Sequence, residues 1–117
     1  MTNSKIYDLE ERTLIFAKNV ILFTNLLPKT IANSEIVKQV IRSSGSVGAN
    51  YIEANESLGK KDFAMRIRIC RKEAKETIYW LKLLETNNDS LETKRAIYLK
   101  EGTELMKIFA AILLKCE

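Results

Sequence analysis

The chain of 117 residues contains no histidine. Histidine is the commonest general base and transition-metal ligand, and it is also the residue that most often activates serine or cysteine nucleophiles. Its absence excludes the Glu-x-x-His pairs of a ferritin-type di-iron site inside a helical bundle. We therefore expect no catalytic residue, no metal site and no cofactor, and the chain is predicted not to be an enzyme.

Turn-forming and strand-forming residues are also scarce. The chain has four glycines, one proline and 8% aromatic residues. Leu, Ile, Ala, Lys and Glu dominate instead, and this composition favours helix. With 46% hydrophobic residues, a chain of this length can bury one core but not two ordinary ones. The sequence therefore predicts one all-α domain over residues 1–117.

Long hydrophobic runs are absent. The longest, Ile108 to Leu114, has seven residues, whereas a membrane-spanning helix needs about 20. The first residues, MTNSKIYDLEER, lack the apolar stretch of a secretory signal. The two cysteines, Cys70 and Cys116, lie among apolar neighbours and are interpreted as small buried hydrophobic residues. These features predict a cytoplasmic protein with no membrane partner.

Apolar residues recur with helical spacing in four segments. The predicted helices span residues 8–27, 34–58, 60–86 and 91–116. Pro28, Gly59 and the turn-forming residues 87–90 separate them, and Asp8 and Ser90 are the expected N-caps. Short connections make sequential helices antiparallel neighbours. The predicted architecture is an antiparallel up-down-up-down four-helix bundle.

Basic residues are concentrated in the third predicted helix. Residues 60–82 contain eight basic and three acidic residues, in a chain whose net charge is +4. On a helix, seven of the basic residues fall within an arc of roughly 120°. We call them the basic stripe: Lys60, Lys61, Arg68, Arg71, Lys72, Lys75 and Lys82. The stripe is interpreted as a solvated helix face, a nucleic-acid-binding surface or a contact for an acidic protein partner.

A second apolar face exceeds what one isolated bundle requires. On the third predicted helix it lies about 120° from the main apolar stripe, and on the first it is formed by two further residues. We call these residues the apolar arc: Leu14, Ile21, Met65, Ile69, Trp80 and Leu83. A wide core contact and self-association both explain such a face, and the second predicts a homo-oligomer.

The second predicted helix carries a row of polar residues on one face. We call it the polar row: Gln39, Arg42, Ser46, Asn50 and Glu53. A solvated face, a partly buried network between helices and a ligand site all remain open for it. Gly45 and Gly48 lie beside this row, where each disfavours helix by about 1 kcal/mol relative to alanine. Close approach of another helix would explain them.

The same residues resemble those of the four helix bundle protein family, also called the 23S ribosomal RNA intervening-sequence protein family. The matching segments are DLEERTLIFAKNVI, the Leu27-Pro28 stop, the polar row with Val47, the run Lys60-Lys61-Asp62-Phe63 and RKEAKETIYWL at residues 71–81. The resemblance implies a ring-like homopentamer of antiparallel bundles that binds RNA or DNA without doing chemistry. In a related branch, the accessory protein of diversity-generating retroelements, a basic pentameric barrel works with a reverse transcriptase. Membership of that branch would imply a reverse transcriptase as protein partner.

Overall fold

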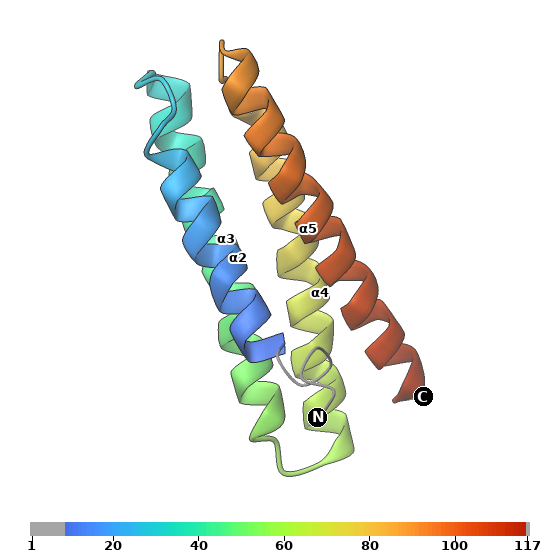
Figure 1. Cartoon of the computed structure of the whole chain (residues 1–117). Coiled ribbons are helices and arrows are strands. Elements are labelled where there is room, and N and C mark those ends of the chain that lie inside the picture. Colours follow the sequence, from blue (N-terminus) through green and yellow to red (C-terminus); the bar gives the residue numbers. More distant parts are fainter. Residues whose placement is uncertain (1–8, 117) are drawn as a thin grey trace.

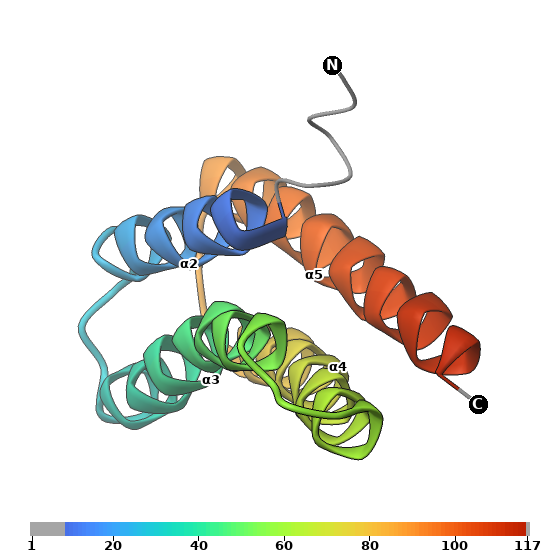
Figure 2. The ribbon, with the colours of Figure 1, turned by 90° about the horizontal axis from the view of Figure 1, so that it is seen from below.

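The computed structural model describes residues 9–116. Within this range the chain forms four α-helices: α2 (Leu9–Thr24), α3 (Ile31–Asn55), α4 (Lys60–Leu83) and α5 (Asp89–Lys115), shown in Figure 1. Each helix packs against the next one in the chain, and α2 also packs against α5. Viewed from below, the helices occupy four corners in the order α2, α3, α4, α5 (Figure 2). The all-α fold is confirmed, and the contacts between adjacent helices are those of an up-down bundle.

Hydrogen bonds between α3 and α4 show their antiparallel register. The Asn33 side chain, near the start of α3, bonds the backbone of Glu85 just beyond the end of α4. Farther along α3, Arg42 contacts Glu76, and Asn50 accepts a hydrogen bond from Arg66. Position on α4 thus falls as position on α3 rises. The short connection at residues 56–59 imposes this arrangement.

The core contains one apolar stripe from each helix. Phe16, Phe23 and Phe109 are its largest fully buried side chains. On α4 the buried apolar stripe comprises Ile67, Cys70, Ala74, Thr77 and Leu81, while Phe63, on the same side of the helix, is only half-buried. The opposite face of α4 is therefore left to solvent.

The observed helix boundaries differ from the predicted ones by up to three residues. The first helix ends at Thr24 rather than residue 27, because its last turn tightens and the amides of Leu26 and Leu27 bond carbonyls three residues back. The second helix spans 31–55 instead of 34–58. Thr30 is its N-cap, because the Thr30 hydroxyl oxygen accepts a hydrogen bond from the backbone amide of Asn33. Leu58, the last residue of the predicted helix, consequently lies beyond the end of the observed helix and is fully exposed.

The third and fourth helices need similar corrections. The third begins at Lys60 as predicted but ends at Leu83 rather than residue 86, because Leu84 has an extended backbone. The fourth begins at Asp89 rather than residue 91. Its N-cap is Asn88 rather than the predicted Ser90. The Asn88 side chain accepts a hydrogen bond from the backbone amide of Leu91. Asn and Ser are about equally good caps, so the sequence alone did not separate them.

Gly48 marks a close approach between α2 and α3. A Cβ atom at this position would lie 2.7 Å from Oγ1 of Thr13 and 3.1 Å from its Cβ. The close approach predicted from this glycine is therefore confirmed. Gly45 has nothing within 4 Å of an added Cβ, so close packing within the bundle does not explain it.

Candidate nucleic-acid interface

All seven residues of the basic stripe lie on α4 and are exposed. The helix periodicity accounts for this, since the centre of the stripe lies about 120° around the helix axis from the buried positions. At 1.5 Å per residue, the stripe from Lys60 to Lys82 is about 33 Å long. It is thus a long, outward-facing row of positive charge.

The six arginines of the chain fall into two groups. Arg12, Arg42, Arg66 and Arg95 bond groups on other segments or in the same helix. Arg12 is the clearest case, because its guanidinium lies 2.7 Å from a Glu101 oxygen and 2.9 Å from Glu104, and the Glu101 hydrogen bond raises the pKa of Arg12. Arg68 and Arg71 belong to the stripe. Among residues 9–116, no carboxylate lies within ion-pair distance of these two or of the five stripe lysines.

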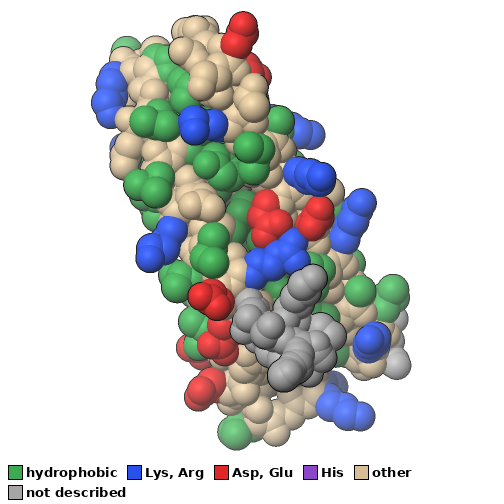
Figure 3. Space-filling model, in the orientation of Figure 1, with side chains coloured by type: hydrophobic (Ala, Val, Ile, Leu, Met, Phe, Trp, Pro, Cys, Tyr) green, Lys and Arg blue, Asp and Glu red, His purple; other side chains and the backbone are tan. Residues whose placement is uncertain are grey.

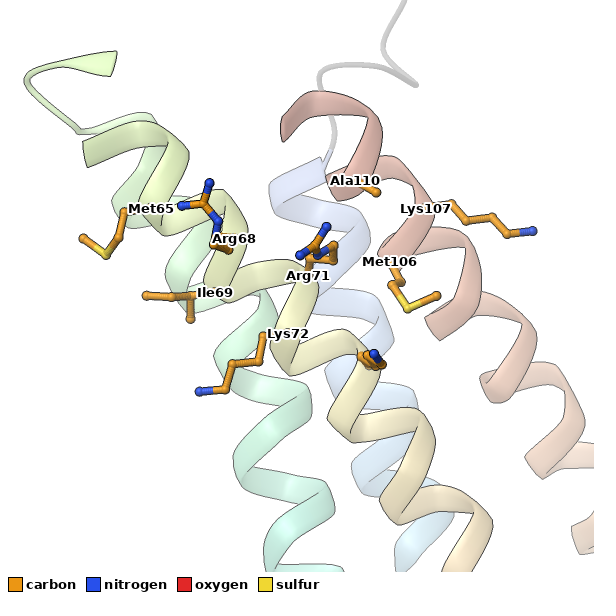
Figure 4. A pocket seen from close by; sticks show the side chains of 9 residues that line it. Met65, Arg68, Ile69, Arg71, Lys72, Met106, Lys107 and Ala110 are labelled. Atoms are coloured by element: carbon orange, nitrogen blue, oxygen red, sulfur yellow. The ribbon is translucent and has the colours of Figure 1, made fainter. Parts of the chain in front are cut away.

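Four stripe residues line an open hollow of about 760 Å³ that side chains of α4 and α5 form together. We call it the groove. Its basic residues are Arg68, Arg71, Lys72, Lys75 and Lys107, and its apolar residues are Met65, Ile69, Met106 and Ala110. In Figure 4, Arg71 lies on the side of α4 toward α5, and Met106 points from α5 toward α4. The groove therefore combines part of the basic stripe with two members of the apolar arc.

The remaining stripe residues lie outside the groove. Lys60 lines a smaller hollow of about 320 Å³ together with Lys115 and Phe63, while Lys61 and Lys82 are exposed on α4. Two α5 lysines, Lys107 and Lys115, line these hollows although they are not members of the basic stripe. Lys107 follows Lys100 by seven residues, so the two lysines share one helix face. This spacing was the feature of the sequence from which a basic face on α5 could have been predicted.

The polar row borders the contact between α3 and α4. Arg42 donates hydrogen bonds to Gln39 on its own helix and to Glu73 and Glu76 on α4, at 3.1 to 3.2 Å. Glu73 is buried, so Arg42 supplies the opposite charge that a buried carboxylate requires.

The other members of the row differ in their surroundings. Asn50 accepts from Arg66 and donates to the carbonyl of Ser46, whereas Glu53 is exposed. Arg42 and Asn50 thus form a network between helices, and Glu53 lies on a solvated face.

The apolar arc divides into residues with different surroundings. Leu14 and Ile21 on α2 are exposed, as are Met65 and Leu83 on α4. Ile69 and Trp80 are half-buried, and Trp80 packs against the core. Of the two explanations for the apolar arc, the wide core contact therefore applies to Trp80. The structure adds the exposed apolar side chains of Ile15 and Leu22 on α2 and of Leu26 just beyond its end. Figure 3 shows hydrophobic side chains reaching the surface over α2.

The remaining candidate features carry little chemistry. Cys70 is buried, as predicted, and burial raises the pKa of its thiol to about 12. Cys116 is only half-buried. Within the described part of the chain, no three Cys, Asp or Glu side chains gather where they could hold a metal ion. None of the helices between residues 9 and 116 is both long and apolar enough to cross a membrane.

Comparisons with known proteins agree with the resemblance found in the sequence. A family model described as 23S rRNA-intervening sequence protein matches residues 6–111. A crystal structure from Bacteroides thetaiotaomicron superimposes with a TM-score of 0.76 at 29% identity, covering 89% of this chain and 96% of that chain. That protein is described as having unknown function and as coming from the S23 ribosomal protein family. Among curated proteins, none matches the chain significantly.

Proposed function

Because the chain belongs to the 23S rRNA-intervening sequence protein family, we propose that it is a non-enzymatic, oligomeric bundle that binds structured RNA or DNA through the basic stripe. The observation that carries the proposal is the group of seven exposed stripe cations without a carboxylate partner among residues 9–116. Like charges placed side by side repel one another, and a polyanion would relieve this repulsion. The four arginines outside the stripe all donate hydrogen bonds, and three of them pair with carboxylates. The feature particular to α4 is that seven cations without such partners share one side of a single helix.

The chemistry of the stripe favours contact with the phosphate backbone. Lys and Arg side chains neutralise phosphates, but sequence readout needs groups that reach base edges or stack on bases. Tyr79 is the only exposed aromatic residue in the stripe segment, and its ring packs edge-on against Trp80. We infer binding by charge and shape, with little dependence on base sequence.

The salt dependence of binding tests the proposal. We expect sub-micromolar affinity for a structured RNA or a matched DNA duplex near physiological salt. The slope of log K against log salt should be about −4 or steeper, which corresponds to about five neutralised phosphates. Fluorescence anisotropy at four or more salt concentrations would measure it. Absence of binding even at low salt would refute the proposal.

Self-association is the second part of the proposal, and α2 carries it. Leu14 is 56% exposed and Leu22 is 62% exposed on a helix of only 16 residues. Ile15 and Ile21 extend the same outer surface. Contiguous exposed apolar surface on a small protein marks an interaction site, and a second copy of the chain would cover it. Five copies is the number that the family resemblance suggests.

Introducing charge on α2 should therefore shift the protein toward monomer. We expect the Leu14→Glu, Ile21→Glu double variant to reduce the mass measured by light scattering, because association would bury the new carboxylates without partners. Both side chains are exposed within one chain, so helicity should be retained. Lys29→Glu, which makes the same change in net charge at an exposed position outside α2, is the control. A double variant with the mass of the parent would show that α2 does not mediate association.

A further inference from the structure

Four exposed apolar side chains flank the contact between α2 and α3. Glu10 accepts a hydrogen bond from Asn55 across this contact, and Gly48 lies against Thr13. Residues that follow or precede Glu10 and Gly48 by four, seven or eleven positions share the same sides of the two helices. They form what we call the seam: Leu14 and Ile21 on α2, with Ile41 and Ile52 on α3. Their exposed fractions lie between 36% and 56%, so the seam is an open apolar face.

A second apolar face lies on α4. Met65 and Leu83 are each 43% exposed, and Ile69 is half-buried. We call these three residues the ridge. Figure 4 shows Met65 and Ile69 pointing away from α5, and the centre of the ridge lies about 90° around α4 from the centre of the basic stripe. The ridge is therefore a separate face, distinct from both the core stripe of α4 and its basic stripe.

The seam and the ridge lie on different sides of the bundle, since α2 and α3 form one side and α4 lies beyond α3 (Figure 2). A surface that binds its own counterpart joins two copies about a twofold axis, whereas two different surfaces that bind each other join copies head to tail and can close into a ring. We propose that the ridge of one copy of the chain packs into the seam of the next copy. This contact rests on the self-association in the proposed function, and it assigns the two surfaces that meet.

Ring symmetry fixes the register of this contact. When the ring axis runs along the helices, no copy is displaced along that axis, so α3 and the α4 of the next copy keep the relative heights that they have within one chain. Within the chain, Asn50 and Arg66 are at the same height because they share a hydrogen bond. One or two residues nearer the α3–α4 connection, Ile52 and Met65 lie within about 2 Å of one height. The ring therefore places the Ile52 of one copy opposite the Met65 of the next.

The same register makes charges complementary at the end of the contact. Glu56 follows the seam on α3 and Lys61 precedes the ridge on α4, at heights that again differ by about 2 Å. Among residues 9–116, neither side chain has an ion-pair partner. The Glu56 of one copy would meet the Lys61 of the next, which favours a second copy of the chain as the occupant of the seam. Arg71 lies on the side of α4 toward α5 and stays free for nucleic acid.

Two variants that complement each other test the proposal. Leu14→Glu, Ile21→Glu disrupts the seam and leaves the ridge intact. Met65→Glu, Leu83→Glu disrupts the ridge and leaves the seam intact. All four side chains are exposed, so both variants should keep their helicity, and each alone should be monomeric by sedimentation equilibrium. An equimolar mixture should form a complex of two chains and no larger species, because one intact ridge meets one intact seam. We expect a Kd of roughly 1–100 µM, since a single contact lacks the ring closure that holds each copy twice.

Ile97→Glu, Leu114→Glu is the control for the ridge variant. It makes the same change in net charge at exposed apolar positions of α5, outside both faces, and should keep the parental mass. A mixture that stays monomeric would overturn the proposed contact, as would a ridge variant with the parental mass or a control that dissociates. A monomeric parent would refute self-association itself. The mass of the parent therefore distinguishes failure of the proposed function from failure of this contact alone.

Disulfide cross-linking tests the register. The Ile52→Cys, Met65→Cys variant is made with Cys116 replaced by serine, and Cys70 stays unreactive because it is buried and its thiol pKa is raised to about 12. Mild oxidation should link this variant into species larger than a dimer on a non-reducing gel, whereas each single-cysteine variant should stay unlinked. A linked dimer of the Ile52→Cys variant would mean that two seams meet about a twofold axis. That result would overturn the proposal, and so would an unlinked double variant in an assembly of parental mass.

Discussion

Reversing three charges of the basic stripe should abolish nucleic-acid binding. In the Arg68→Glu, Arg71→Glu, Lys75→Glu variant we expect affinity for RNA or DNA to fall at least 100-fold near physiological salt. Three phosphate contacts are lost, and three carboxylates then repel the backbone. All three side chains are exposed and lack ion-pair partners within the described residues. Helicity and assembly should consequently remain as in the parent.

A second triple variant controls for net charge. Each basic-to-acidic substitution changes the charge by −2, so three of them take the chain from +4 to −2 wherever they are made. Lys18→Glu, Lys29→Glu and Lys94→Glu alter exposed lysines outside α4. Anisotropy titrations of both variants should show that affinity falls much less in this control. Equal losses would mean that overall charge, rather than the stripe, controls binding, and a stripe variant with parental affinity would exclude the stripe as the contact surface.

Alanine substitutions at the two interior glycines of α3 should have opposite effects on stability. Gly48→Ala is expected to lower the free energy of unfolding by up to about 2 kcal/mol, because its new methyl group would lie 2.7 Å from Oγ1 of the buried Thr13 and overpacking of this kind costs about 1–3 kcal/mol. This steric effect outweighs the gain of about 1 kcal/mol in helix propensity. Gly45→Ala meets nothing within 4 Å, so it should raise stability by about 0.5–1 kcal/mol.

Urea unfolding at one fixed protein concentration would measure both changes, since association makes apparent stability depend on concentration. Thr13→Ala removes the oxygen that the Gly48→Ala methyl would meet. Part of the loss should therefore be recovered when the two substitutions are combined. Gly48→Ala with parental or higher stability would show that α2 and α3 can separate without penalty. A loss of stability in Gly45→Ala would instead indicate that a neighbouring molecule contacts this position.

The sequence predicted the helices well and their ends less well. Apolar residues at helical spacing identify each segment, because burial of one face is a property of the helix alone. Helix ends depend on which of several neighbouring polar residues acts as the cap. Thr30 and Asn88 do so here, while Ser34 and Ser90 lie within the helices. The Asn33 side chain also forms two hydrogen bonds with the backbone of Glu85, beyond the end of α4. These bonds join residues 52 positions apart, so no local sequence pattern predicts them.

The candidate site was predictable only in part, for the same reason. The basic stripe could be recognised from the spacing of α4, and all seven of its members are exposed. The groove could not, because Lys107 and Met106 join it from a different helix. Likewise, the sequence grouped Trp80 with Met65 in one arc, whereas Trp80 packs against the core and Met65 lines the groove.

Periodicity and composition were enough to establish an all-helical chain, the order of its helices and the concentration of positive charge on one of them. Each of these properties follows from residues a few positions apart on the same helix, where geometry is constant. The pairing of Arg42 with Glu73, the close approach of Gly48 to Thr13 and the composition of the groove required the packed bundle. They depend on the register and spacing between helices, which arise only when side chains from distant segments pack together.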